Sequence, residues 1–214
     1  MLYSNRLAFE SAIIWRGQVF NMDIVQRKLF PMIETKRFVL RRITANDANE
    51  VYDYFSKDEV TQYYDLDSFR EIEQAIDLIE RWDERFENNQ GIRWGIAKKE
   101  DNKLIGSCGY HHWAKEHFKA EIGYELSPQY WRQGVMTEVL KVVLSYGFQQ
   151  MNLHRIEAFY DPDNIASKRS LLKAGFRYEG TLRKCFFEKG KFVDAEICSQ
   201  LSSDFYNNAF YQLS

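Results

Sequence analysis

The chain carries the stretch Glu121-Ile-Gly-Tyr-Glu-Leu-Ser-Pro-Gln-Tyr-Trp-Arg-Gln-Gly-Val-Met-Thr-Glu-Val-Leu140, which predicts a strand, a tight turn and the start of a helix. Apolar residues alternate with others from Glu121 to Leu126, and Pro128 ends this strand because proline cannot continue the ladder. Downstream, an apolar stripe predicts a helix that begins near Gly134; its members are Val135, Val139, Val142, Val143 and Tyr146. The first amide groups of such a helix lack partners within the helix, so the turn favours an anion such as phosphate.

The turn itself has the sequence Trp131-Arg132-Gln133-Gly134-Val135-Met136-Thr137-Glu138. It resembles the pyrophosphate-binding loop of the GCN5-related N-acetyltransferase (GNAT) superfamily, and more narrowly that of the branch that acetylates the N-terminal Ala or Ser of ribosomal proteins. Trp131 and Met136 depart from the general superfamily pattern but match this branch. The resemblance implies acetyl-CoA as co-substrate, with its pyrophosphate bound by Arg132, Gln133, Gly134, Val135, Met136 and Thr137.

A second motif follows about thirty residues after the loop, as in the superfamily. Asn164, Ser167 and Gly175-Phe176 have the spacing of the segment after the second cofactor-binding strand. Gly175 is placed to end the intervening helix. The resemblance implies cofactor contacts from Asn164 and Ser167, and it extends over residues 32–201.

The resemblance also implies a mechanism. In this superfamily the parallel strands equivalent to 121–126 and 154–160 splay apart, so that freed backbone groups up to Leu126 bind the pantetheine. Glu121 is the candidate base for the acceptor amine, acting through water. Ser167 is the candidate partner of the leaving thiolate, because the tyrosine that many members use is Leu171 here. A glutamate that some members place in the last hairpin aligns with Phe186, so the choice of base stays open.

Several acceptors fit these motifs. The N-terminal Ala or Ser of a ribosomal or other protein is the first expectation, because an α-amino group has a pKa near 7.7–8.0 and needs little help to lose its proton. A small amine, either a polyamine or an aminoglycoside, is the alternative within the enzyme class. A catalytically weak protein that binds CoA as a sensor or interaction module is the alternative outside it.

Composition narrows the class of protein. The 214 residues, 45% apolar and 16% aromatic, are enough for one domain, which we expect over residues 31–214. A formal net charge of −2 gives no general attraction to nucleic acid or membranes. Three cysteines without paired spacing favour reduced thiols and a cytoplasmic location. Residues 1–30 form an apolar-rich extension that packs on the body or on a second copy in a homodimer, unless the natural start is Met22 or Met32.

The remaining pattern predicts an α+β (mixed α/β) fold, with a mostly antiparallel twisted sheet that contains the splayed parallel pair and is flanked by helices. We expect strands over 33–42, 93–97, 103–112, 153–159, 176–187 and 191–201. Helices are expected from Thr44-Ala45-Asn46-Asp47 to about Phe55, and from Ser68 onward. The three histidines His111, His112 and His117 near Cys108 match no zinc-ligand spacing, so we expect no metal ion.

Overall fold

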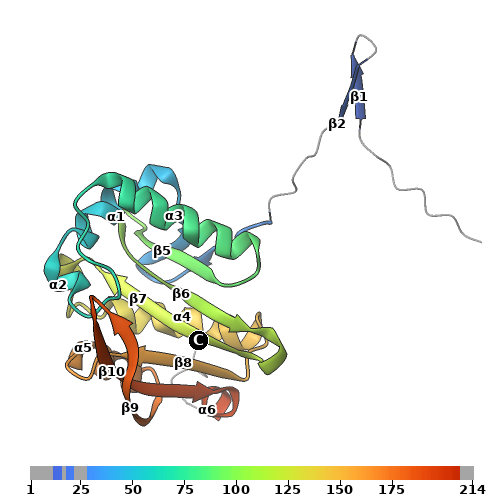
Figure 1. Cartoon of the computed structure of the whole chain (residues 1–214). Coiled ribbons are helices and arrows are strands. Elements are labelled where there is room, and N and C mark those ends of the chain that lie inside the picture. Colours follow the sequence, from blue (N-terminus) through green and yellow to red (C-terminus); the bar gives the residue numbers. More distant parts are fainter. Residues whose placement is uncertain (1–11, 16–17, 22–27, 208–214) are drawn as a thin grey trace, which may run out of the picture.

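The computed structural model describes residues 12–15, 18–21 and 28–207. Its centre is an eight-stranded sheet in the order β3-β4-β5-β6-β7-β8-β10-β9 (Figure 1). The strands are β3 Ile33–Glu34, β4 Phe38–Arg42, β5 Ile92–Lys98, β6 Leu104–Ala114, β7 Lys119–Leu126, β8 Arg155–Tyr160, β9 Arg177–Glu188 and β10 Lys191–Leu201. The helices are η1 Ala45–Asp47, α1 Ala48–Phe55, α2 Asp58–Thr61, α3 Ile72–Glu87, η2 Lys115–His117, η3 Pro128–Tyr130, α4 Val135–Gln149, α5 Ile165–Lys173 and α6 Ser202–Asn207.

One pair of neighbours in this sheet, β7 and β8, is parallel, and the other pairs of the sheet are antiparallel. The parallel pairing covers only Lys119–Arg155, Ala120–Ile156 and Glu121–Glu157. Beyond Glu121 the two strands continue without pairing to each other, β7 to Leu126 and β8 to Tyr160. The expected fold class, including the splayed strand pair, is therefore confirmed.

The two faces of the sheet bury two apolar clusters, because successive residues of a strand point to opposite faces. Ile105 of β6 belongs to a cluster that includes Val139 and Val143 of α4, whereas its neighbour Leu104 packs with a cluster from α1 and α3. Helix α4 therefore covers one face, and α1 and α3 cover the other (Figure 1). Elements on both faces border the gap between β7 and β8.

Most predicted elements form where expected, and two differ. The stretch 33–42 is not one strand, because the chain reverses at Thr35, whose hydroxyl and backbone amide both bond to Phe38, and β3 pairs back on β4. The helix expected from Ser68 begins three residues later, with Glu71 as its N-cap. Ser68 instead hydrogen-bonds to Asp58, so a contact ten residues away has outweighed the local capping motif.

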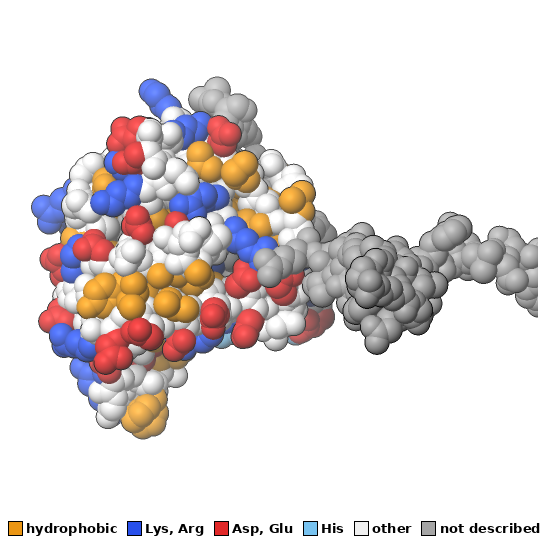
Figure 2. Space-filling view, turned by 90° about the horizontal axis from the view of Figure 1, so that it is seen from above, with side chains coloured by type: hydrophobic (Ala, Val, Ile, Leu, Met, Phe, Trp, Pro, Cys, Tyr) orange, Lys and Arg blue, Asp and Glu red, His pale blue; other side chains and the backbone are white. Residues whose placement is uncertain are grey.

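The expected N-terminal extension is described only in part. Strands β1 Ala12–Trp15 and β2 Gln18–Asn21 pair antiparallel in a two-stranded sheet separate from the main one (Figure 1). The rest of residues 1–27, which includes the candidate start Met22, lies outside the described residues, whereas the candidate start Met32 is described and exposed. On the surface in Figure 2, acidic and basic side chains are interspersed, with an apolar group among them. No helix in the described part of the chain is long and apolar enough to cross a bilayer.

Candidate active site

A pocket of about 1140 Å³ occupies the gap between β7 and β8 and extends to both faces of the sheet. Its walls come from the turn before α4, the free half of β7, the end of β8 and α5. The opposite end is formed by residues 59–66, by α3 and by the tip of the β9–β10 hairpin. Nearly every residue that the sequence predicts for the site lies in this wall: Glu121, Leu126, Arg132, Gly134, Val135, Met136, Thr137, Asn164 and Ser167.

The turn before α4 is shaped by two residues with left-handed backbone, Arg132 at φ +59° and Gly134 at φ +72°. Gly134 is the N-cap of α4, so the first amides of this 15-residue helix open toward the pocket. Arg37 braces the turn from outside: its backbone amide and Nε donate to Glu138, and its Nη1 donates to the carbonyl of Gln133. Gln133 is the predicted residue outside the pocket wall, because its side chain folds back onto the Gln129 carbonyl at 2.7 Å.

Glu121 is the last residue of the parallel pairing, at the point where the strands separate. Its Oε2 lies 3.4 Å from Nε2 of His111 and 3.0 Å from Nδ1 of His112. Burial alone would raise the pKa of this carboxyl, but the two histidines outweigh it and hold the pKa below its usual value. The sequence predicts Glu121 but not these partners. The third histidine, His117, is exposed and lies 3.9 Å from Glu116, and Cys108 is buried in the core.

Ser167 lies in the first turn of α5, across the gap from β7. Its backbone amide donates to Oδ1 of Asn164, which is the N-cap of α5. Ser167 lines the pocket, and its hydroxyl lies 3.0 Å from the hydroxyl of Tyr124. Tyr124 is a residue that the sequence reasoning missed. Burial raises its pKa well above the usual value, so it stays a neutral donor that can orient Ser167.

A buried ion pair fixes the free half of β7 to the layer that contains α1. Arg93 of β5 contacts Glu125 of β7, and their side chains are only 9% and 3% exposed. The Glu125 carboxylate also accepts from the hydroxyls of Ser107 and Tyr64. Nη1 of Arg93 donates to the carbonyl of Gly123 at 2.9 Å. Strand β7 therefore keeps its position here without a partner strand on the β8 side.

The last hairpin supplies a carboxylate that the sequence reasoning missed. Phe186, where the ribosomal branch has a glutamate, packs edge-on against Phe159 with ring centroids 5.6 Å apart. Glu188 lies two residues further along β9 and also lines the pocket. Burial and the nearby charges of Asp65 and Asp161 raise its pKa. The sequence does carry a signal for Glu188: it follows Phe186 by two residues, and residues two apart on a strand point to the same face.

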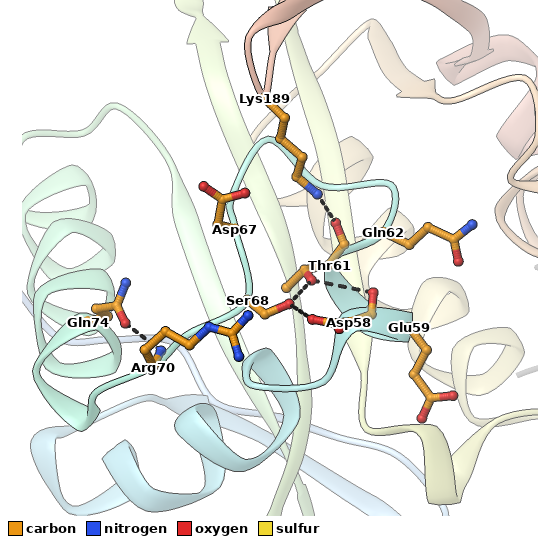
Figure 3. Close-up of a pocket in the computed structure, with 9 residues that line it drawn as sticks. All are labelled: Asp58, Glu59, Thr61, Gln62, Asp67, Ser68, Arg70, Gln74 and Lys189. Carbon is orange, nitrogen blue, oxygen red and sulfur yellow. Dashed lines mark hydrogen bonds between the residues drawn. The ribbon is translucent and has the colours of Figure 1, made fainter.

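A second pocket of about 840 Å³ adjoins the first at Glu59 and Gln62 (Figure 3). There the side chain of Lys189, at the hairpin tip, donates to the carbonyl of Thr61 at 2.7 Å. The hydroxyls of Thr61 and Ser68 lie 2.7 Å apart, and Ser68 donates to Asp58. The segment 58–70 and the hairpin tip are thereby joined into one border of the main pocket.

Comparison with known proteins agrees with this geometry. The acetyltransferase (GNAT) domain matches residues 37–177. The uncharacterized N-acetyltransferase YoaA of Bacillus subtilis (strain 168) is 45% identical over 171 residues, 80% of this chain and 97% of that protein. Spermidine N(1)-acetyltransferase of Escherichia coli (strain K12) is 26% identical over 158 residues, 73% of this chain and 81% of that protein. The crystal structure of ribosomal-protein-S5-alanine acetyltransferase from Vibrio fischeri has a TM-score of 0.71 and 25% identity, covering 81% of this chain and 98% of that one. These matches show that the chain belongs to the GNAT family of N-acetyltransferases.

Proposed function

We propose that this enzyme transfers the acetyl group of acetyl-CoA to the α-amino group of a protein that begins with Ala or Ser. The observation that carries the proposal is the continuous pocket between β7 and β8, which joins the turn before α4 to the segment 59–66 and the hairpin tip. Basic side chains at the turn and on α5, those of Arg132, Arg169 and Lys173, suit the phosphates of CoA. Solved structures with this fold include complexes with CoA and with acetyl-CoA.

The proposed chemistry assigns removal of the amine proton and stabilisation of the departing thiolate to two separate groups. Glu121, where the strands separate, takes the proton of the acceptor amine through water. Ser167, with Tyr124 as its neighbour, donates a hydrogen bond to the departing thiolate. The free backbone amides of β7 polarise the thioester carbonyl. Leu171 is 1% exposed in the core and takes no part.

The acceptor end of the pocket supports a peptide. Acidic Glu59, Asp65 and Glu188 lie there together with basic Arg81 and Arg85. A polyamine carries only positive charge, so the two arginines would repel it. A single carboxylate also suffices for an α-amino group, since its pKa lies far below that of an alkyl amine. Spermidine remains the second candidate because of the acidic residues and the spermidine acetyltransferase relative.

The test is release of CoA thiol from acetyl-CoA in the presence of short peptides that begin with Ala, Ser or Met, compared with spermidine and an aminoglycoside. We expect turnover with the Ala and Ser peptides and loss of turnover when their N-terminus is already acetylated. Turnover with spermidine alone would show that the acceptor is a small amine and not a peptide. CoA binding without turnover on any acceptor would refute the proposed reaction and favour a CoA-binding module.

The base is tested by Glu121→Gln, with Glu188→Gln as the matched carboxylate in the same pocket. We expect Glu121→Gln to lower kcat about 10- to 100-fold with CoA affinity unchanged. Glu188→Gln should change kcat less than Glu121→Gln does. A larger loss from Glu188→Gln would assign the base to the hairpin, and equal loss of turnover and CoA affinity in Glu121→Gln would make Glu121 structural.

The compartment is also part of the proposal. Cys108, Cys185 and Cys198 are free thiols in the structure, the first and last of them buried. Free thiols support a reducing compartment such as the cytoplasm.

A further inference from the structure

The side chains of His111, His112 and Glu121 form a cluster that acetyl transfer alone does not require. Each side chain offers one ligand atom, and these atoms lie within 4.8 Å of one another. A base for proton transfer needs one route for its proton, but here one carboxylate faces two imidazoles. The contacts are 3.4 Å and 3.0 Å to the same Oε2 of Glu121.

The cluster depends on an irregularity in β6. His111 lies opposite Glu121 in the antiparallel register, so their side chains share a face. The next residue of a regular strand would point away. The pairing, however, jumps from His111–Glu121 to Ala114–Lys119, three steps along β6 against two along β7. His112, at φ +46°, lies in this bulge and is turned toward Glu121 as well.

Strand β7 leaves room for the arrangement. A Cβ atom placed at Gly123 would lie 3.3 Å from Cε1 of His111, tighter than ordinary contacts. Without it, the His111 ring can lie across β7 and direct Nε2 at Glu121 two residues away. His111 is one-third exposed and Glu121 about one-quarter, so ions can reach the cluster from the pocket.

We propose that His111, His112 and Glu121 bind a divalent transition-metal ion, for which Zn²⁺ is the natural probe. Zinc takes nitrogen and oxygen ligands at about 2.0–2.2 Å in a tetrahedron, which sets ligand atoms about 3.3 Å apart. The two contacts to Glu121 already have such lengths. Two imidazoles and one carboxylate leave a fourth position open and favour zinc, cobalt or nickel over magnesium.

The ion would bind at the point where the strands separate. It takes the lone pairs of Glu121 and therefore inhibits acetyl transfer. This consequence rests on the proposed role of Glu121, whereas binding of the ion does not. The expectation of no metal, drawn from spacing, could not include this site because adjacent histidines share a face only in a bulge.

The test is binding of Zn²⁺ to the EDTA-stripped protein, measured by competition with a chromophoric chelator. Because thiolates are zinc ligands and Cys185 is exposed, the titrations are made in a Cys185→Ser background. We expect one equivalent bound, at least about tenfold weaker affinity in His111→Ala and in His112→Ala, and no change in His117→Ala. Co²⁺ in place of Zn²⁺ should give the visible absorption of a four-coordinate site, and Mg²⁺ should not compete.

His117→Ala is the matched control, because this exposed histidine lies in the adjacent η2 turn but outside the cluster. Equal affinity in His112→Ala and His117→Ala, with both variants folded by circular dichroism, would overturn the proposal, as would the absence of a bound equivalent in the parent. Inhibition by Zn²⁺ is followed through acetylated peptide by mass spectrometry, since the thiol of released CoA binds zinc itself. Binding without inhibition would keep the metal site and count against Glu121 as the base.

Discussion

Replacing Arg93 by Met should lower the free energy of unfolding more than the loss of any surface ion pair would. Arg93 and Glu125 are 9% and 3% exposed, so water cannot solvate the carboxylate that the substitution leaves behind. Methionine keeps the unbranched apolar first part of the side chain but not the guanidinium, whose carbon lies 5.3 Å from the centroid of the Trp82 ring. The change therefore removes charge and hydrogen bonds while leaving most of the packing.

The size of this loss of stability follows from the groups that remain unpaired once Arg93 is removed. Arg93 contacts Glu125, the carbonyl of Gly123 at 2.9 Å and the hydroxyl of Ser107. Without it, the buried carboxylate keeps only hydroxyl donors, and breaking such a pair costs about 3–5 kcal/mol. Since a domain is stable by only about 5–15 kcal/mol, this is a large fraction of the free energy of unfolding. The double variant Arg93→Met/Glu125→Leu should regain at least about 2 kcal/mol, because no charge is then left buried.

The assay is urea unfolding followed by tryptophan fluorescence and circular dichroism, with the free energies combined in a double-mutant cycle. Lys57→Met is the control, because its partner Asp53 is 59% exposed and that pair should contribute less than about 0.5 kcal/mol. A cost below about 1 kcal/mol for Arg93→Met, or additive costs in the double variant, would refute the account of a buried, coupled pair.

Three further changes probe the cofactor end and the fold. Ser167→Ala should lower kcat about tenfold with CoA affinity unchanged, a modest loss because a thiolate leaves readily; unchanged kcat would remove Ser167 from the reaction. Gly134→Glu should weaken CoA binding at least about tenfold by calorimetry, because it strains a φ of +72° and places a negative charge at the phosphate turn. Gly190→Glu, at φ +77° in the hairpin, should leave that affinity unchanged, and equal losses would make backbone strain the cause. Asp47→Asn should cost about 1–3 kcal/mol at pH 7. Burial raises the pKa of Asp47, but Arg41 and Thr44 outweigh it and hold the pKa below its usual value, so this stability is present above the ordinary pKa and is lost as pH falls through the lowered one. Urea midpoints of the two proteins should therefore converge in acid, and a constant difference would contradict the assignment.

The elements that the sequence predicts well are those whose pattern is local. The meander β5–β6–β7 follows from alternation within each strand, and α4 follows from its apolar stripe and Gly134. One of the two differences arises from a contact that is not local in the sequence. Ser68 has the form of a helix cap, yet Asp58 binds its hydroxyl and the helix starts after Glu71. The other difference, the reversal at Thr35, is local but involves no strong turn residue such as glycine or proline. The Thr35 hydroxyl donates to the carbonyl of Phe38 and accepts from the backbone amide of Phe38.

The candidate site shows the same contrast between local and distant residues. The residues of the phosphate turn lie together in the sequence, so a motif can find them. The sequence also names Glu121, from its position on the strand, and Ser167, from its motif, as candidates, but it does not name the residues that contact them. Tyr124 reaches Ser167 across 43 positions, and Arg93 reaches Glu125 across 32. Such pairs depend on strand register and helix placement, which single-sequence patterns do not encode.

The alternation of β7 explains why the proposed reaction uses two separate groups, a base for the amine and a hydrogen-bond donor for the thiolate. Glu121, Gly123 and Glu125 point to the face that carries Arg93 and His111, whereas Tyr124 points to the face that carries α5 and Ser167. In the proposed reaction, the amine therefore approaches an acetyl group in the gap from one face, and the thiolate leaves toward the other. One carboxylate cannot serve both faces of a strand, because the backbone lies between them. The proposal therefore places the replacement for the tyrosine that many members of the superfamily have at the position of Leu171 on the α5 face, where Tyr124 and Ser167 are in contact, and not at Glu121.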